Sequence, residues 1–582
     1  MLIPYGGSAS VSAGFDPEAI SHSVWLDGSA DNLSAALGAK TRTKAVIGTW
    51  VQKTAFNLNN ATIFSKKNPG SEFSLRMDEN GTNGKLTIFD FDGSSFQYNA
   101  TTTSKVLRDH GWYHIMISIS TTASAGSRLK FIVNGIDQTS TLNVGTDYTA
   151  SDNPSITGSQ VTQWGVGYNG SQYLKCYLAQ SFMLDDVSIQ NGDVAVSDIL
   201  ATANDRFVPK ASSKIGALAS AAGGDSFCLD YSNSSNLGND ISSNNNDFTA
   251  NSMSSANQVA HSPSSPFPIL SGINGDTGVS NALDFGSRLN VGVADWRSIF
   301  ASMQFGTTGK FYVEVRIHTE TASNGMVSGI QKAANASKAF GNFIGASSTG
   351  HGYSFYTLNF RIYHNGSTEE LDSSGACAAG DIIGLALDLD NNKFWMSKNN
   401  TYILSGNPAA GSNDTVPAGT TLTSSLSDFD YVFGHSSSAS EDYFVNFGQD
   451  STFGGLRSAG NNADGNGVGD FAFAPPSGFL ALHPSNLTSQ TFSNPATGSF
   501  EGNASSTNGP FVFLGFQPSI SDALTINSNS VTYGTDVDLC SNGFKVRSSS
   551  SNFNATGTNN YSLVTTNALQ INGEFPPAFA VF

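Results

Sequence analysis

The stretch WYHIMISIS at residues 112–120 decides the fold class. Every second side chain in it, from Tyr113 to Ile119, is tyrosine or isoleucine, while Trp112 and His114 fall at the intervening positions. Successive side chains of a strand point to opposite faces of a sheet, so a period of two gives a strand two distinct faces. The stretch therefore predicts a β-strand.

Similar short runs, separated by turn-forming residues, occur along most of the chain. The further expected strands are Ala45–Lys53, Leu86–Phe91, Arg128–Val133, Tyr173–Leu184, Lys310–Ile317, Asp381–Leu389 and Phe394–Ser397. Dipeptides such as Asn134-Gly135 and Asp92-Gly93 tolerate the positive φ that tight hairpins need. Helical signals are few, and Val196–Arg206 is the main candidate for a short helix. We predict an all-β, multidomain chain of antiparallel β-sandwiches.

Composition sets the domain count and excludes several classes of protein. A chain of 582 residues predicts about three to five domains. Its formal net charge is −18, and Lys66 and Lys67 form its only adjacent basic pair, so we expect no nucleic-acid binding. No apolar run approaches the ~18 residues of a membrane helix, and no secretory leader is evident, so we expect neither membrane insertion nor secretion. The four cysteines are far apart, and we expect unpaired thiols.

Shifts in composition divide the chain into five segments. These are an N-terminal docking segment at 1–20, a strand-rich block at 21–208, a Ser/Asn/Pro-rich linker at 209–281, a second strand-rich block at 282–455, and a Gly/Asn-rich connector with a small C-terminal β domain at 456–582. Proline and serine without periodicity are typical of connectors. Phe227, Leu229 and Tyr231 could nevertheless add a strand from the linker to a neighbouring sheet.

The first block resembles a laminin-G-like, concanavalin-type jelly roll. The resemblance rests on WYHIM at 112–116, LKFIVNG at 129–135 and YLAQSFMLD at 177–185. Lys175-Cys176 stands where that family would have a glycine. The second block resembles a SPRY domain, through GDIIGLALD at 380–388 and FWMSKN at 394–399, with Asn400 in place of the usual glycine.

A third resemblance concerns the order of the blocks. LDYSNSSNLGND at 229–240, SSNNNDF at 242–248, FVNFGQD at 444–450 and APPSGF at 474–479 are similar to segments of tailed-bacteriophage virion proteins, in which such a linker joins a laminin-G-like domain to a SPRY domain. The resemblance implies a structural virion component, most often a tail fibre or surface appendage that attaches to a host glycan or protein. Its implied partners are other virion proteins and further copies of itself, with a homotrimer expected.

Two alternatives to a tail fibre remain open. One is a capsid decoration or head-fibre protein. The other is a polysaccharide depolymerase, because concanavalin-type folds include glucanases. Glycoside hydrolysis needs two carboxylates flanking the bond, yet the first block holds only Glu72 and Glu79 and has no E-x-D-x-x-E string. We therefore expect a non-enzymatic protein and assign no catalytic residue.

Candidate ion and ligand contacts lie in hairpins and loops. Asp388 and Asp390 could offer oxygen ligands to calcium, although a polar tight turn is the favoured explanation. Asp90 and Asp92 are further candidates, because laminin-G-like domains often bind calcium at a rim. No other cofactor is expected. The predicted ligand contacts are aromatic and polar residues of two loops: Tyr168, Asn169, Tyr173, His351, Tyr353 and Tyr356. The alternative is that some of these rings face the core.

Overall fold

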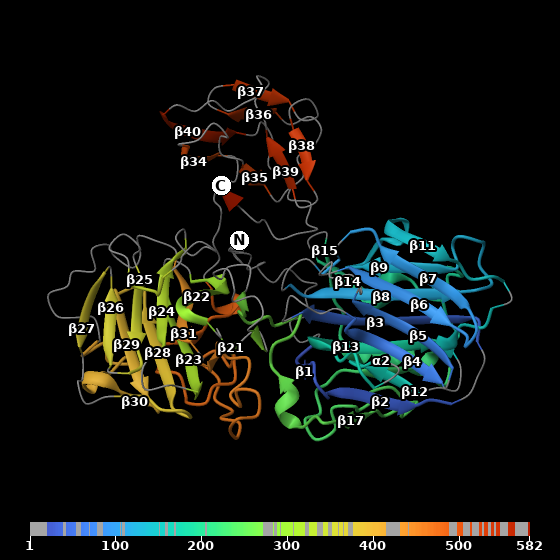
Figure 1. Ribbon diagram of the computed structural model, residues 1–582, viewed down its shortest axis with the longest axis horizontal. Coiled ribbons are helices and arrows are strands. Elements are labelled where there is room, and N and C mark those ends of the chain that lie inside the picture. Colours follow the sequence, from blue (N-terminus) through green and yellow to red (C-terminus); the bar gives the residue numbers. More distant parts are fainter. Residues whose placement is uncertain are drawn as a thin grey trace.

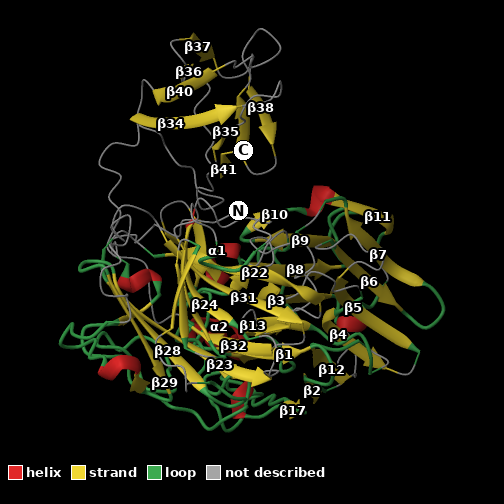
Figure 2. Ribbon diagram, turned by 60° about the vertical axis from the view of Figure 1, so that its left-hand side comes forward, coloured by secondary structure: helices red, strands yellow, loops and turns green. Residues whose placement is uncertain are grey.

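The computed structural model describes residues 20–487 with internal gaps, and beyond them only the strand backbones of the C-terminal block. The gaps fall at 39–41, 54–59, 69, 78–84, 105, 108–110, 151, 158–160, 168–169, 204–205, 272–282, 285–287, 291–292, 306–307, 320–324, 334–341, 347–351, 359, 365, 371–375, 415–430 and 440–441. Strands dominate the described chain (Figure 2). None of its helices has the length and apolarity that a bilayer span requires.

The first sandwich consists of two antiparallel sheets, drawn in blue to green (Figure 1). One sheet has the order β10 (Ile136–Asp137), β9 (Leu129–Val133), β8 (Tyr113–Ser120), β3 (Lys44–Lys53), β13 (Lys175–Asp185), β1 (Ser23–Asp27) and β18 (Gln258–Val259), with β16 (Phe227–Leu229) also on β13. The other has the order β11 (Leu142–Thr146), β7 (Phe96–Thr102), β6 (Leu86–Phe91), β5 (Ser71–Met77), β4 (Thr62–Asn68), β12 (Val161–Trp164), β2 (Asn32–Ala36) and β17 (Thr249–Asn251). The predicted all-β fold class is confirmed.

Alternation along β8 explains how these sheets pack. Ile115, Ile117 and Ile119 belong to the core between the two sheets, whereas Met116 lies in a separate cluster on the opposite face of its sheet. Each fully buried isoleucine contributes roughly 1.5–3 kcal/mol. The period of two read from residues 112–120 thus places apolar side chains in two different cores.

Two helices cover that opposite face, and the sequence anticipated neither one correctly. The helix expected over Val196–Arg206 is wrong beyond its first turn. α1 (Val196–Ile199) ends at Ile199, because the chain then forms β14 (Leu200–Ala203), which pairs with β15 (Arg206–Pro209). Strand pairing here overrides local helical propensity.

The second helix falls in the segment that composition marks as a linker. α2 (Ser212–Ala221) buries Ile215 and Ala219 in the same cluster as Trp50 and Phe182 of the sheet. β16 pairs with β13, which confirms the added strand at Phe227 and Leu229, whereas Tyr231 lies beyond its end. This part of the chain is therefore folded onto the first sandwich.

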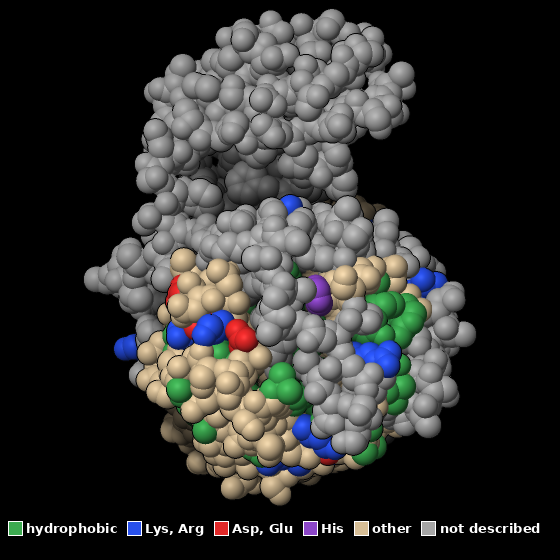
Figure 3. Space-filling view, turned by 90° about the vertical axis from the view of Figure 1, so that its left-hand side faces the viewer, with side chains coloured by type: hydrophobic (Ala, Val, Ile, Leu, Met, Phe, Trp, Pro, Cys, Tyr) green, Lys and Arg blue, Asp and Glu red, His purple; other side chains and the backbone are tan. Residues whose placement is uncertain are grey.

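The second sandwich also has two sheets, drawn in green to orange on the left of Figure 1. Its outer sheet has the order β19 (Leu270–Ser271), β22 (Val293–Gln304), β31 (Tyr431–Ala439), β24 (Val327–Lys332), β25 (Gly352–Tyr356), β26 (Arg361–His364) and β27 (Ser367–Glu370). The other has the order β20 (Leu283–Asp284), β21 (Arg288–Asn290), β32 (Asp442–Asn446), β23 (Lys310–Thr319), β28 (Ile382–Asp388), β29 (Lys393–Lys398) and β30 (Thr401–Tyr402), with β33 (Leu480–Ala481) parallel to β23. Viewed from the β27 side, the described surface is mostly uncharged (Figure 3).

The C-terminal block forms two four-stranded antiparallel sheets. Their orders are β34 (Thr497–Ala504), β40 (Gly557–Val564), β36 (Ala523–Ile526), β37 (Asn529–Thr532), and β38 (Val537–Cys540), β39 (Gly543–Val546), β35 (Val512–Leu514), β41 (Ala580–Val581).

An apolar seam joins the first and second sandwiches. Its buried members are Trp25, Tyr177, Val259, Ile382, Phe444, Phe453 and Ala472. Residues 258–271, which we call the shared segment, run along it. β18 pairs with β1 of the first sandwich, while β19 pairs with β22 of the second. The same short stretch of chain thus supplies strands to both sandwiches.

A buried carboxylate holds a second stretch of chain against the other side of the seam. Glu314 on β23 accepts hydrogen bonds from the backbone N–H groups of Ala472 (2.8 Å) and Phe473 (2.9 Å) and from Nδ2 of Asn446 (3.1 Å). Burial raises the pKa of Glu314 to about 7, although these hydrogen bonds oppose the shift. The carboxyl group accepts hydrogen bonds from backbone N–H groups that would otherwise be buried without partners.

The seam predicts a large difference between two Phe→Ala substitutions. Phe444→Ala removes a ring that is 3% exposed and should lower the free energy of unfolding by about 3–5 kcal/mol. Phe96→Ala removes a ring that is 47% exposed and has two ring neighbours, and should cost about 1–2 kcal/mol. Denaturant titration of the full chain measures both values, and equal costs would show that the seam does not hold the sandwiches together.

Glu314 predicts a specific pH dependence of stability. Its folded-state pKa lies above the ordinary value of 4.5, so the folded protein holds this proton more tightly than the unfolded chain does. The contribution of Glu314 to the free energy of unfolding therefore grows as pH falls from about 7 to about 4.5. It is lost as pH rises through the same interval. The difference in unfolding free energy between wild type and Glu314→Gln should change by on the order of 3 kcal/mol over this interval. A difference that stays constant with pH would contradict the assignment.

Candidate functional site

The structure separates the residues predicted to contact a ligand. Tyr168, Asn169 and His351 lie outside the described residues. Tyr173 is half-buried in the loop before β13. Tyr353 is only 5% exposed and belongs to the core of the second sandwich, as the alternative interpretation allowed.

Tyr356, the other predicted residue that the structure describes in the second sandwich, presents part of its ring to solvent. It is half-buried, and its ring contacts those of Trp296 and Tyr363. The predicted loop residues therefore do not come together in one site within the described chain.

The predicted calcium ligands serve a hairpin turn. Asp388 pairs with Lys310 (Oδ2 to Nζ, 2.9 Å) and accepts hydrogen bonds from Asn391, while Asp390 accepts one from the N–H of Gly309 (2.9 Å). Burial raises the pKa of Asp388, but its bonds to Lys310 and Asn391 outweigh this and hold the pKa below its ordinary value. In the described ranges, no group of three or more His, Cys, Asp or Glu side chains could hold a metal ion.

Asp90 and Asp92 likewise have structural partners. Asp90 is buried and accepts hydrogen bonds from the hydroxyl of Tyr148 (2.8 Å) and the N–H of Ser155 (2.9 Å). Asp92 accepts bonds from the N–H groups of Ser94 and Ser95 in the turn between β6 and β7. Hydrogen bonds from this backbone lower the pKa of Asp92 to about 2, so it stays ionised and holds the turn at any ordinary pH.

That turn presents the most accessible aromatic residue among the described residues of the first sandwich. Phe96 is 47% exposed at the start of β7. The pairing of β6 with β7 shifts register between Asp90, which faces Tyr98, and Phe91, which faces Phe96. The shift leaves Gln97 as an extra residue, and such bulges redirect the neighbouring side chain. Phe96 therefore points away from the core that holds Tyr98.

Two neighbouring rings hold the exposed ring in place, and Arg76 packs on one of them. Phe96 packs edge-to-face on Phe91 and Phe89, with ring centroids 5.4 Å and 5.9 Å apart. The guanidinium of Arg76 lies 4.6 Å from the centroid of Phe89. Edge-to-face pairs contribute about 0.5–1.5 kcal/mol beyond their buried area, and an exposed cation–π contact about 0.5–1 kcal/mol. The ring of Phe96 is thus fixed while much of its surface stays accessible.

Polar side chains share the outer face of this sheet with the phenylalanines. Asn99 lies opposite Phe89, and Thr101 lies opposite Thr87, with their hydroxyls 3.1 Å apart. Asn143 of β11 lies opposite Thr101 and is exposed. Residues in register across strands share one face, so amide and hydroxyl groups lie beside the braced ring. We call Phe96, Phe89, Phe91, Arg76, Asn99 and Thr101 the Phe96 patch.

The Phe96 patch can bind a ligand that has one apolar face and several hydroxyls. A pyranose ring fits this description, because its C–H face can stack on an aromatic ring while amides and hydroxyls bond its edge. The patch is not predictable from the sequence, because strict alternation along FQYNATT puts Phe96 on the same face as Tyr98. The Asp92-Gly93 turn was visible in the sequence, but the bulge beside it was not.

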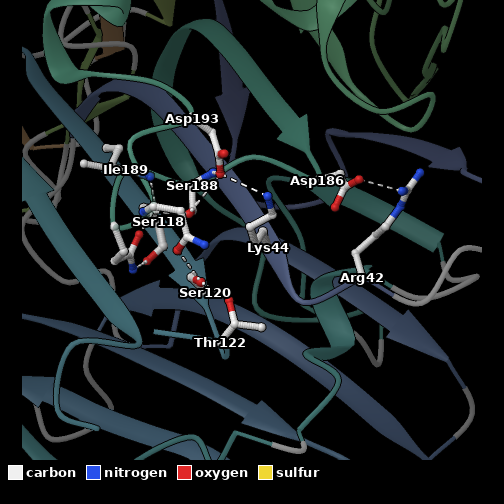
Figure 4. Close-up of polar contacts among 11 residues, drawn as sticks. Arg42, Lys44, Ser118, Ser120, Thr122, Asp186, Ser188, Ile189 and Asp193 are labelled. Atoms are coloured by element: carbon white, nitrogen blue, oxygen red, sulfur yellow. Dashed lines mark hydrogen bonds and ion pairs between the residues drawn. The ribbon is translucent and has the colours of Figure 1, made fainter. Parts of the chain in front are cut away.

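A second polar network lies at the ends of central strands of the other sheet, where the loop after β13 closes on β3 and β8 (Figure 4). Arg42 pairs with Asp186 at 2.9 Å, and Lys44 pairs with Asp193 at 3.1 Å. The hydroxyl of Ser118 accepts the N–H of the loop residue Ile189 at 3.0 Å. These groups bond to one another, and the network fastens the loop to the sheet.

One protein-family model matches most of the first sandwich. Residues 27–199 match the family model described as the concanavalin A-like lectin/glucanases superfamily, of the laminin G type. The first sandwich is thus similar to concanavalin A-like domains. The comparison with curated protein sequences gave no match.

Two solved structures are similar to parts of the chain. The SPRY domain of human HERC1 is 16% identical, with 28% of this chain and 89% of that chain covered and a TM-score of 0.21. A native heptameric SAP-like pentraxin from Limulus polyphemus is 14% identical, with 31% and 82% covered and a TM-score of 0.24.

Proposed function

We propose that the chain is a structural component of a tailed-bacteriophage particle, a tail fibre or other surface appendage, which attaches to glycans on the host surface through the Phe96 patch. The observation that carries the proposal is a braced, half-exposed phenylalanine beside amide and hydroxyl side chains on a concanavalin A-like domain. The order of the sequence segments at 229–248, 444–450 and 474–479 supports the virion assignment.

The chemistry of the patch favours a neutral sugar. Arg76 is its only charged member, and that charge is directed at the ring of Phe89. The net charge of −18 opposes the approach of an acidic polymer. A single ring stacked on Phe96 binds weakly, but several copies on one particle convert weak contacts into durable attachment through effective concentration. The proposal therefore needs a homo-oligomer or repeated attachment points on the particle.

The carboxyl groups whose pKa burial raises lie in the protein interior, which is consistent with binding without catalysis. Burial raises the pKa of Asp31, Asp90 and Asp450 to about 6 and that of Glu314 to about 7. Each is at most 9% exposed and accepts hydrogen bonds from neighbouring backbone or side-chain groups. These four groups support the protein interior and do not belong to the Phe96 patch.

Glycan attachment predicts a selective loss of binding in one of two matched variants. Phe96→Ala should weaken binding of the full chain to host cells or purified host polysaccharide at least tenfold, which is about 1.4 kcal/mol. Leu404→Ala removes an apolar side chain that is 50% exposed on the second sandwich, so it should bind like wild type. Surface plasmon resonance on immobilised polysaccharide measures both. Equal binding by wild type and Phe96→Ala would exclude the patch, and release of reducing ends would favour a depolymerase.

The virion assignment has a separate test. The chain should be present in purified particles of the phage that encodes it, detected by mass spectrometry, and antibody labelling should place it on the tail in electron micrographs. Label on the capsid instead would support a decoration or head-fibre protein. Absence from the particle would overturn the virion assignment whatever the chain binds.

A further inference from the structure

Two buried histidines contact Phe267, the residue with which the shared segment enters the core of the second sandwich. The N–H of Phe267 donates to Nδ1 of His261 (2.9 Å), and its ring packs on that of His483, with centroids 4.8 Å apart. His261 belongs to the shared segment, whereas His483 follows β33 of the second sandwich. Their side chains are buried on opposite sides of the same phenylalanine. We call these two residues the histidine pair.

Hydrogen bonds fix both rings in the neutral form. Nδ1 of His483 accepts the N–H of Ser485 at 3.2 Å, as Nδ1 of His261 does from its own backbone donor. A ring nitrogen that accepts a hydrogen bond carries no proton, so the single proton of each ring lies on Nε2. The two Nε2 atoms then donate to Oε1 of Gln52 and to the hydroxyl of Ser265. A second proton would have to bind Nδ1, where a backbone N–H already points.

The groups that face the histidine pair do not compensate a second proton. The first sandwich surrounds His261 with three uncharged side chains, Gln52, Trp112 and Tyr177. Burial raises the pKa of Tyr177 well above its ordinary value, so this hydroxyl stays neutral. Two carboxylates act on the surroundings, Asp464 on His483 and Asp450 on Tyr177. Both already accept hydrogen bonds from backbone N–H groups.

The same contacts weaken the affinity of both rings for a second proton. Burial lowers the pKa of His261 to about 3, and the neighbouring His483 lowers it further. Burial also lowers the pKa of His483 to about 4, although Asp464 and Ser265 oppose this shift. In water each imidazole would return to the ordinary value of 6.5. Each ring therefore binds a proton more tightly once it is released, so the closed junction is favoured above about pH 6.5 and loses this advantage as pH falls.

We propose that the histidine pair is an acid-sensitive switch, in which protons on both rings release Phe267 and open the junction between the two sandwiches. Protonation turns Nδ1 of His261 from an acceptor into a donor, which then faces the N–H of Phe267. Two imidazolium charges on either side of one buried ring also repel each other. Because the shared segment supplies strands to both sandwiches, its release loosens both edges. The inference goes beyond the proposed glycan attachment and does not depend on it.

The size of the effect follows from the number of protons. Each proton taken up on opening favours the open form about tenfold per pH unit, so two histidines give on the order of a hundredfold per unit below about pH 6. Glu314 acts in the opposite direction, because its contribution grows as pH falls. The switch is therefore measured against histidine variants, in which Glu314 is unchanged.

The test is hydrogen exchange of the full chain, followed by mass spectrometry at pH 7 and pH 5. Asparagine keeps an oxygen acceptor near the place of Nδ1 but takes up no proton. Between these pH values, peptides covering 258–271 should lose protection at least a hundredfold more in wild type than in the double variant His261→Asn/His483→Asn. Each single variant should lie between the two. His364→Asn, which changes a buried histidine of β26 that stacks on Tyr353, should behave like wild type.

Two outcomes would overturn the proposal. Equal pH dependence of residues 258–271 in wild type and the double variant would show that the histidine pair does not control the junction. Equal loss of protection in peptides covering β6 would show that acid melts the whole fold instead of opening the junction. If the double variant does not fold, the single variants decide, because wild-type pH dependence in both of them would contradict the switch.

Discussion

Hydrogen bonding along residues 258–271 is divided between two sandwiches, and the arrangement of the molecule depends on that division. The hydroxyl of Ser23 donates to the carbonyl of His261 (2.5 Å) on the side of the first sandwich. On the other side, the N–H of Ala260 donates to the carbonyl of Gln449 (3.1 Å). Neither sandwich completes its own edge without this segment. The Phe96 patch on the first sandwich and the whole second sandwich are therefore carried by one continuous body.

The buried side chain of His261 connects the shared segment to the first sandwich. It is fully buried, and burial lowers its pKa to about 3, so the ring is neutral. Nδ1 accepts the N–H of Phe267 (2.9 Å), which leaves the proton on Nε2, where it is donated to Oε1 of Gln52. The ring also packs on Trp112 and Tyr177, with centroids 5.3 Å and 5.0 Å away. One neutral imidazole thus connects a strand of the first sandwich with the chain that enters the second.

The sequence predicted the strands that local patterns determine, but not the features that depend on residues far away in the chain. Alternation and turn dipeptides predicted β6 with its observed bounds, and β3, β8 and β28 within a residue or so at each end. The failures depend on distant partners. Leu200–Ala203 became a strand because Arg206–Pro209 lies beside it, and Phe96 turned outward because Gln97 forms a bulge against β6. Tyr353 and Tyr356 have similar neighbours in the sequence. They lie on opposite faces of β25, so the ring of Tyr353 is in the core and that of Tyr356 is at the surface.

The strand shared between the sandwiches has a consequence for any attempt to study them separately. A fragment that begins at the compositional boundary near residue 282 lacks Phe267 and Leu270, both of which are in the core of the second sandwich. It also lacks β19, so the edge of β22 loses its neighbour. An uncovered, apolar sheet edge is a template for self-association. Dissection at that boundary would therefore yield material prone to aggregate, whereas a cut before Gln258 would leave the second sandwich with its edge intact.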